Sequence, residues 1–121
     1  MPIICVMSEP KRNWALVLGA SSGFGEAASV ALARAGRNIF GVHLDRRATL
    51  PNAERIAGEI EAAGGRALFW NVNAADAEKR AEVVAGMKEA IAAGDGESVD
   101  VVLHSLAFGT LKPFLGDEKE R

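Results

Sequence analysis

Short apolar segments alternate with longer segments of helical periodicity along most of this chain. The predicted strands span residues 14–18, 38–44, 67–70 and 99–107, and the first of them, W-A-L-V-L, is a continuous apolar run typical of a strand buried on both faces. Helical spacing and turn signals predict three helices between them, over residues 24–35, 52–63 and 76–93. Strands and helices of these lengths predict an α/β fold with a parallel sheet, because each parallel connection needs a crossover. Right-handed crossovers then place helices on both faces and give the strand order 3-2-1-4.

The chain has 121 residues, which is enough for one domain but not for two. We expect residues 1–12 to form an N-terminal extension and residues 13–121 to form the domain, a fold truncated after about four strands. The formal net charge of −2 and the lack of a basic stripe exclude a nucleic-acid-binding surface. No apolar run approaches the roughly 18 residues of a membrane span. The single cysteine, Cys5, rules out an internal disulfide and suits the cytoplasm.

The stretch between the first predicted strand and the first predicted helix is rich in glycine and serine. Residues 19–25 read G-A-S-S-G-F-G. Doubly wound folds bind a dinucleotide pyrophosphate at this junction, where the chain must turn sharply and its backbone must come close to the phosphates. The free N–H groups of the helix attract the anion, and the hydroxyls of Ser21 and Ser22 offer further donors. The alternative interpretation is that the glycines serve only the geometry of the turn.

This motif resembles the T-G-A-S-S-G-I-G phrase of the short-chain dehydrogenase/reductase family, which holds NAD(H) or NADP(H) on a Rossmann-like domain. Residues 18–25 read L-G-A-S-S-G-F-G and differ only at the leading Thr and at the Ile. The likeness extends from residue 13 to about residue 114, and its glycine spacing differs from the G-x-G-x-x-G of the commoner dinucleotide fold. One departure is Glu26, an acid near the expected phosphate. The resemblance implies a pyrophosphate site made by Gly19, Ser21, Ser22, Gly23, Phe24 and Gly25.

Two further markers follow the third and fourth predicted strands. Where the family has an Asp-Val pair that contacts adenine, this chain has Asn71 and Val72. An Asn amide oxygen still accepts a hydrogen bond from the adenine amino group, and a turn-forming Asn is the alternative. Where the family has N-N-A-G beside the cofactor ribose, residues 104–107 read H-S-L-A, which is similar to the enoyl-[acyl carrier protein] reductase branch. The resemblance implies a cofactor border made by Ser105, Leu106 and Ala107.

The residues after the second predicted strand bear on the choice between NAD and NADP. A carboxylate there binds the ribose diol of NAD, whereas a basic residue accommodates the 2′-phosphate of NADP. Asp45 lies twenty residues after Gly25, the usual offset of that carboxylate, but the register of the family puts the position on His43. Arg46 and Arg47 follow, and two guanidinium groups suit a phosphate. The sequence is compatible with both cofactors and favours NADP. The alternative interpretation is that residues 45–47 form a solvated surface turn with no role in cofactor binding.

The chain contains no tyrosine, although the family draws its catalytic proton donor from a Tyr paired with a Lys. Lys112 and Lys119 have no Tyr partner, and Ser105 has no neighbouring base to activate it. His104 lies at a strand end, where a His is more often a structural residue than a general acid. We therefore predict no catalytic residue and no activity for this chain alone. The resemblance implies a longer, homo-oligomeric parent that transfers hydride between the nicotinamide and a small-molecule carbonyl or alcohol, or an enoyl- or acyl-thioester. The alternative is a non-catalytic nucleotide-binding or regulatory module.

Overall fold

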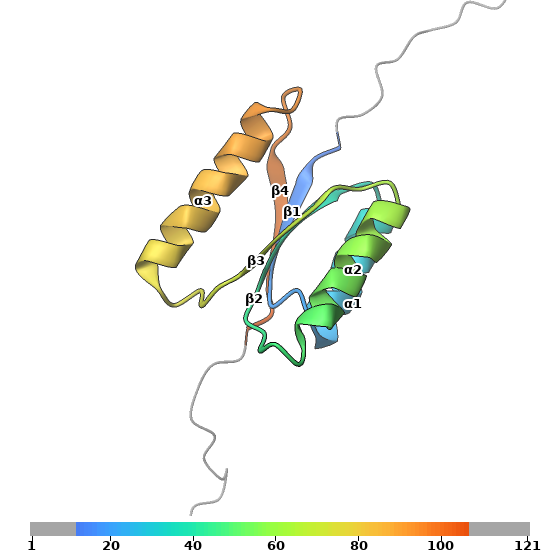
Figure 1. The fold of residues 1–121 in the computed structure, drawn as a ribbon. Helices are drawn as coiled ribbons and strands as arrows, with labels where there is room; N and C mark the ends of the chain where they lie inside the picture. Colours follow the sequence, from blue (N-terminus) through green and yellow to red (C-terminus); the bar gives the residue numbers. More distant parts are fainter. Residues whose placement is uncertain (1–11, 107–121) are drawn as a thin grey trace, which may run out of the picture.

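The computed structural model describes residues 12–106, which form a four-stranded parallel sheet with helices on both faces (Figure 1). The elements are β1 (Trp14–Leu18), α1 (Gly23–Arg34), β2 (Asn38–His43), α2 (Leu50–Ala62), β3 (Ala67–Asn71), α3 (Ala77–Ala92) and β4 (Val99–His104). The strand order is β3-β2-β1-β4, which confirms the predicted order. Helices α1 and α2 cover one face of the sheet, and α3 covers the other.

The clearest difference from the prediction is at the end of β4, which stops at His104 rather than at residue 107. Its partner β1 ends at Leu18, and the chain then turns away at Gly19, whose φ is 89°. The Ser105 N–H still donates to Leu18 O at 2.8 Å, but the described chain offers no strand for pairing beyond that bond. Ala107, the last residue of the predicted strand, lies outside the described residues.

The other predicted boundaries move by one or two residues. Helix α2 begins at Leu50 rather than at residue 52, because Pro51 fits the first helical turn, where its missing N–H is not needed. Strand β2 ends one residue earlier than predicted, at His43, and β3 extends one residue further, to Asn71. Asp76 is the N-cap of α3, as predicted, and its carboxylate accepts from the N–H groups of residues 78 and 79.

The two faces of the sheet are packed differently. On the α1/α2 face, small and branched side chains form a cluster that is fully shielded from solvent, made by Ala15, Val17, Ala20, Ala33, Ile39, Ile56 and Ile60. On the α3 face an aromatic row crosses three strands, with Trp14 and Phe40 stacked at 3.8 Å between ring centroids and Trp70 beside Phe40 at 5.8 Å. Gly86 of α3 lies over this row, where a Cβ would come within 2.9 Å of the Trp70 indole. Glycine therefore allows α3 to approach the sheet, although Val83 is the one residue that the helix fully buries.

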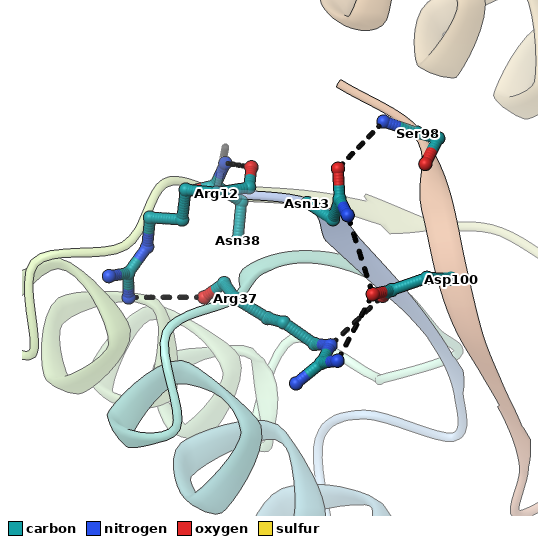
Figure 2. Close-up of polar contacts among 6 residues, drawn as sticks. All are labelled: Arg12, Asn13, Arg37, Asn38, Ser98 and Asp100. Atoms are coloured by element: carbon teal, nitrogen blue, oxygen red, sulfur yellow. Dashed lines mark hydrogen bonds and ion pairs between the residues drawn. The ribbon is translucent and has the colours of Figure 1, made fainter. Parts of the chain in front are cut away.

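Polar side chains tie the strands together at the amino edge of the sheet (Figure 2). Asn38 is buried, and its amide donates to Arg12 O and accepts from Arg66 N–H, both at 2.9 Å. Arg37 forms a bidentate ion pair with Asp100 of β4, in which Nε donates to Oδ1 at 2.9 Å and Nη2 donates to Oδ2 at 3.0 Å. These contacts join the starts of all four strands and leave the opposite, carboxyl edge free for loops.

None of the helices within residues 12–106 combines the length and the apolar character needed to cross a membrane.

Candidate functional site

The glycine-rich loop lies at the carboxyl edge of the sheet, between β1 and α1, and its glycines serve different purposes. Gly19 packs against the end of β4 so closely that a Cβ would overlap Ser105 O, and a Cβ on Gly25 would overlap Gly19 O. Both glycines therefore permit close backbone packing inside the domain. Gly23 has a φ of 57°, but a Cβ there would meet no described atom within 4 Å. The turn at Gly23 thus faces open space.

The N-terminus of α1 opens into the same space. Its first N–H groups have no partner within the helix, and the side chain of the N-cap residue, Ser22, makes no capping hydrogen bond. Ser22 is exposed, whereas Ser21 is buried. Phe24 projects outward with 88% of its surface exposed. The helix end is therefore a set of unpaired donors with a positive dipole, which suits an anion.

Helix α2 braces this loop through two residues that the sequence did not single out. The Asn52 amide donates to Ser21 O, and the Asn52 oxygen accepts from Arg55 at 2.7 Å. Arg55 also pairs with Glu26 and with Glu59, and these hydrogen bonds, that of Glu26 foremost, raise the pKa of Arg55. The acid that departs from the family pattern, Glu26, thus forms an ion pair with Arg55 of α2. Residues 52, 55 and 59 have the spacing of one helix face, which is visible in the sequence, but only the tertiary fold brings this face to the loop.

The end of β2 arranges His43 and Asp45 as a pair. His43 is 4% exposed, its ring lies 5.8 Å from that of Phe69, and its Nδ1 lies 2.8 Å from Asp45 Oδ2. The other carboxylate oxygen of Asp45 accepts from the Thr49 hydroxyl at 3.2 Å. His43, the position expected from the family register, is therefore covered, and the group nearer the surface is the Asp45 carboxylate.

Asn71 lies beside the His43–Asp45 pair, and its side chain contacts the main chain of Asp45. Its Oδ1 accepts from Asp45 N–H at 2.8 Å, and its Nδ2 donates to Asp45 O at 3.1 Å. The next residue, Val72, donates its N–H to His43 O at 2.9 Å. The predicted adenine acceptor, Asn71 Oδ1, thus already holds one hydrogen bond and keeps one lone pair.

Arg46 and Arg47 are exposed on the turn that follows Asp45. In the described part of the chain, neither guanidinium takes part in an ion pair. Two exposed cations thus lie on the same side of the sheet as the N-terminus of α1, since both segments follow the carboxyl ends of neighbouring parallel strands.

An apolar cavity of about 500 Å³ lies between α3 and the sheet and reaches the carboxyl edge. Val72, Leu106 and His104 are among its walls, so the predicted adenine and ribose positions border apolar surface. Ala107, the remaining predicted cofactor contact, lies outside the described residues. Within residues 12–106 no three His, Cys, Asp or Glu side chains converge as a metal site would require.

The chain matches the family described as short chain dehydrogenase over residues 13–120. A protein of Sinorhizobium meliloti assigned as a short-chain alcohol dehydrogenase is 28% identical, with a TM-score of 0.66 over 88% of this chain and 39% of its own. The 3-oxoacyl-[acyl-carrier protein] reductase of Brucella melitensis in complex with NAD is 21% identical, with a TM-score of 0.68 over 92% of this chain and 40% of its own, and shares the fold. The chain thus spans about two fifths of the length of these proteins.

Proposed function

The chain belongs to the short-chain dehydrogenase family, a family of NAD(P)-binding oxidoreductases, and on this premise we propose that the carboxyl edge of its sheet binds a nicotinamide dinucleotide. The observation that carries the proposal is the geometry at Gly23. Gly23 is the first residue of α1, its backbone turns with a positive φ into open space, and the side chain of the N-cap residue makes no hydrogen bond to the helix. A pyrophosphate fits such a position because it needs close backbone approach and several N–H donors.

The surrounding residues support the other parts of the dinucleotide. Val72 and Leu106 offer apolar surface to a flat base at the edge of the cavity, and Asn71 keeps an acceptor for an amino group. The turn after β2 faces the ribose, as expected for the second strand of a dinucleotide-binding fold. The full set that we assign to the cofactor is Gly19, Ser21, Ser22, Gly23, Phe24, Gly25, His43, Asp45, Arg46, Asn71, Val72, Ser105, Leu106 and Ala107.

Between the two dinucleotides we favour NADP(H). One oxygen of the Asp45 carboxylate lies 2.8 Å from His43 Nδ1, and the other shares the single Thr49 hydroxyl proton with Arg46 O, each at 3.2 Å, whereas Arg46 and Arg47 are exposed. A guanidinium fork matches the oxygens of a 2′-phosphate and is always charged. The NAD alternative requires Asp45 to accept the ribose hydroxyls in addition to its present partners.

The bound nicotinamide would supply hydride chemistry to a parent protein that acts on a carbonyl, an alcohol or an enoyl-thioester. This chain's own part in that reaction is to bind and orient the dinucleotide, because it has no tyrosine to serve as the proton donor. A non-catalytic nucleotide-binding module is the second possibility. The single cysteine suits a cytoplasmic protein.

Dinucleotide binding is tested with a matched pair of glycine variants, Gly23→Ala and Gly36→Ala. Both positions have a positive φ, 57° at Gly23 and 101° at Gly36, and a Cβ added at either would meet no described atom within 4 Å. Alanine at Gly23 carries a backbone cost of about 1–2 kcal/mol. Gly36 lies further from the left-handed region that L-residues adopt, so Gly36→Ala carries at least that cost and controls for backbone strain. Only Gly23 faces the proposed pyrophosphate. We expect NADPH binding, measured by calorimetric titration, to weaken at least about tenfold in Gly23→Ala, which corresponds to about 1.4 kcal/mol, and to persist in Gly36→Ala. Equal affinities in the two variants would refute the proposed site.

A further inference from the structure

Asn71, the last residue of β3, clamps the main chain of Asp45 in the turn after β2. The amide donates to Asp45 O at 3.1 Å and accepts from Asp45 N–H at 2.8 Å. A primary amide can do both because it carries a donor and an acceptor side by side. His43 and Asn71 are the last paired residues of β2 and β3, so the clamp fixes the turn to the sheet itself.

The side chain of Asp45 also has partners within the turn. One carboxylate oxygen lies 2.8 Å from His43 Nδ1, and the other accepts from the Thr49 hydroxyl. The next carbonyl, Arg46 O, accepts from the N–H groups of residues 49 and 50, each at 3.0 Å. The turn is therefore fixed at its root by the sheet and at its far end by the start of α2.

What this fixed turn presents to solvent is the pair Arg46 and Arg47. We propose that Asn71 is a positioning residue for cofactor selection, which clamps Asp45 so that Arg46 and Arg47 meet the 2′-phosphate of NADP(H). This inference rests on the proposed function. It assigns to Asn71 a role beyond adenine contact, and the role requires an amide rather than a carboxylate.

The substitution Asn71→Asp separates these two roles. A carboxylate still accepts from Asp45 N–H and from an adenine amino group, but it cannot donate to Asp45 O and repels that oxygen instead. The loop that follows β3 supplies a matched control in Asn73, whose Oδ1 accepts from Ala75 N–H at 2.9 Å. Asn73→Asp keeps that bond and adds the same charge two residues away, without touching the clamp.

The full 121-residue chain and its variants are titrated with NADPH and with NADH, and the ratio of the two dissociation constants is compared. We expect Asn71→Asp to reduce the preference for NADPH about tenfold, the value of one charge-assisted phosphate contact. Asn73→Asp should stay within about twofold of the wild-type ratio, because exposed charges are strongly screened. The uncharged variant Asn71→Leu should lose the preference as well.

A second arm removes the arginines. Arg46→Ala/Arg47→Ala should abolish the preference for NADPH, and adding Asn71→Asp to this variant should change the ratio no further, because a positioning residue acts through the groups it positions. Circular dichroism checks that each variant is folded.

The inference is overturned if Asn71→Asp weakens NADPH and NADH equally, since Asn71 then acts on the shared adenine alone. An equal change of the ratio in Asn73→Asp also overturns it, because a general field effect then suffices. A wild-type chain that binds NADH more tightly than NADPH overturns it while leaving dinucleotide binding intact. A wild-type chain that binds neither overturns the proposed function, and this inference with it.

Discussion

Replacing the buried Asn38 with alanine should destabilise the domain by about 2–4 kcal/mol. Asn38 is 1% exposed, and its amide donates to Arg12 O and accepts from Arg66 N–H (Figure 2 shows the contact with Arg12). Arg12 lies two residues before β1 and Arg66 directly before β3, so this one side chain joins the starts of three neighbouring strands.

The magnitude follows from the two backbone groups, Arg12 O and Arg66 N–H, that lose their hydrogen-bond partner in the alanine variant. A shielded polar group left without its hydrogen bond costs about 1–3 kcal/mol. Two such groups would cost about 2–6 kcal/mol. Arg12 O and Arg66 N–H are both part-buried, so water partly replaces the lost partner and the lower part of that range, about 2–4 kcal/mol, is expected. A domain of this size is typically stable by about 5–15 kcal/mol, and the variant should lose a large share of that.

Urea unfolding followed by the fluorescence of Trp14 and Trp70 measures the loss, with the slope m checked for constancy. The control is Asn13→Ala. Asn13 accepts from Ser98 N–H at 3.1 Å and reaches Asp100 at 3.5 Å, but both contacts are exposed, so water can replace them and the loss should stay below about 1 kcal/mol. An Asn38→Ala loss no larger than that of Asn13→Ala would refute the argument from burial.

Two other measurements test the fold and the chemistry. Asp100→Asn should lower the urea midpoint near neutral pH but not in acid. The hydrogen bond from Arg37 lowers the pKa of Asp100 from its ordinary value of 3.8, so the pair stabilises the fold above that value and its contribution disappears as the pH falls through the lower folded-state pKa; a difference that persists in acid would contradict this. The purified chain should also transfer no hydride from NADPH or NADH to ketones or enoyl-thioesters above background. General acid catalysis is worth about 10²–10⁴-fold and the chain has no tyrosine; turnover that His104→Ala abolishes would overturn this prediction.

The sequence was sufficient for the architecture because local signals and general rules agree on it. Apolar runs such as residues 14–18 allow little but a buried strand, and the handedness of crossovers then leaves few strand orders. The end of β4 could not be predicted in the same way. Leu106 and Ala107 are again apolar, but a strand also needs a partner, and β1 turns away at Gly19.

The candidate site was predicted in its parts but not in its connections. The glycine loop is local and was recognisable from residues 19–25 alone. Asn52 belongs to α2, whereas the loop leads into α1, so its contact with the loop depends on how α2 packs beside α1. The bonds between Asn71 and Asp45 likewise arise because β2 and β3 are neighbours, which a motif cannot express. The cofactor contacts themselves and the preference for NADP stay predictions.

The position of β1 inside the sheet has a consequence for the order in which this chain can fold. Its partner on one side, β2, follows within the next turn and helix, but Trp14 pairs on the other side with Val99, 85 residues later. Closing a loop of that length costs roughly 4 kcal/mol of chain entropy. During synthesis, β1, β2 and β3 can assemble as soon as residue 71 has emerged, whereas β4 needs the 33 residues up to His104. At about 5–20 residues per second, synthesis of these residues takes roughly 2–7 s. During this interval β1, a central and apolar strand, has one edge without its β4 partner, and a chaperone or another nascent chain can compete for that edge.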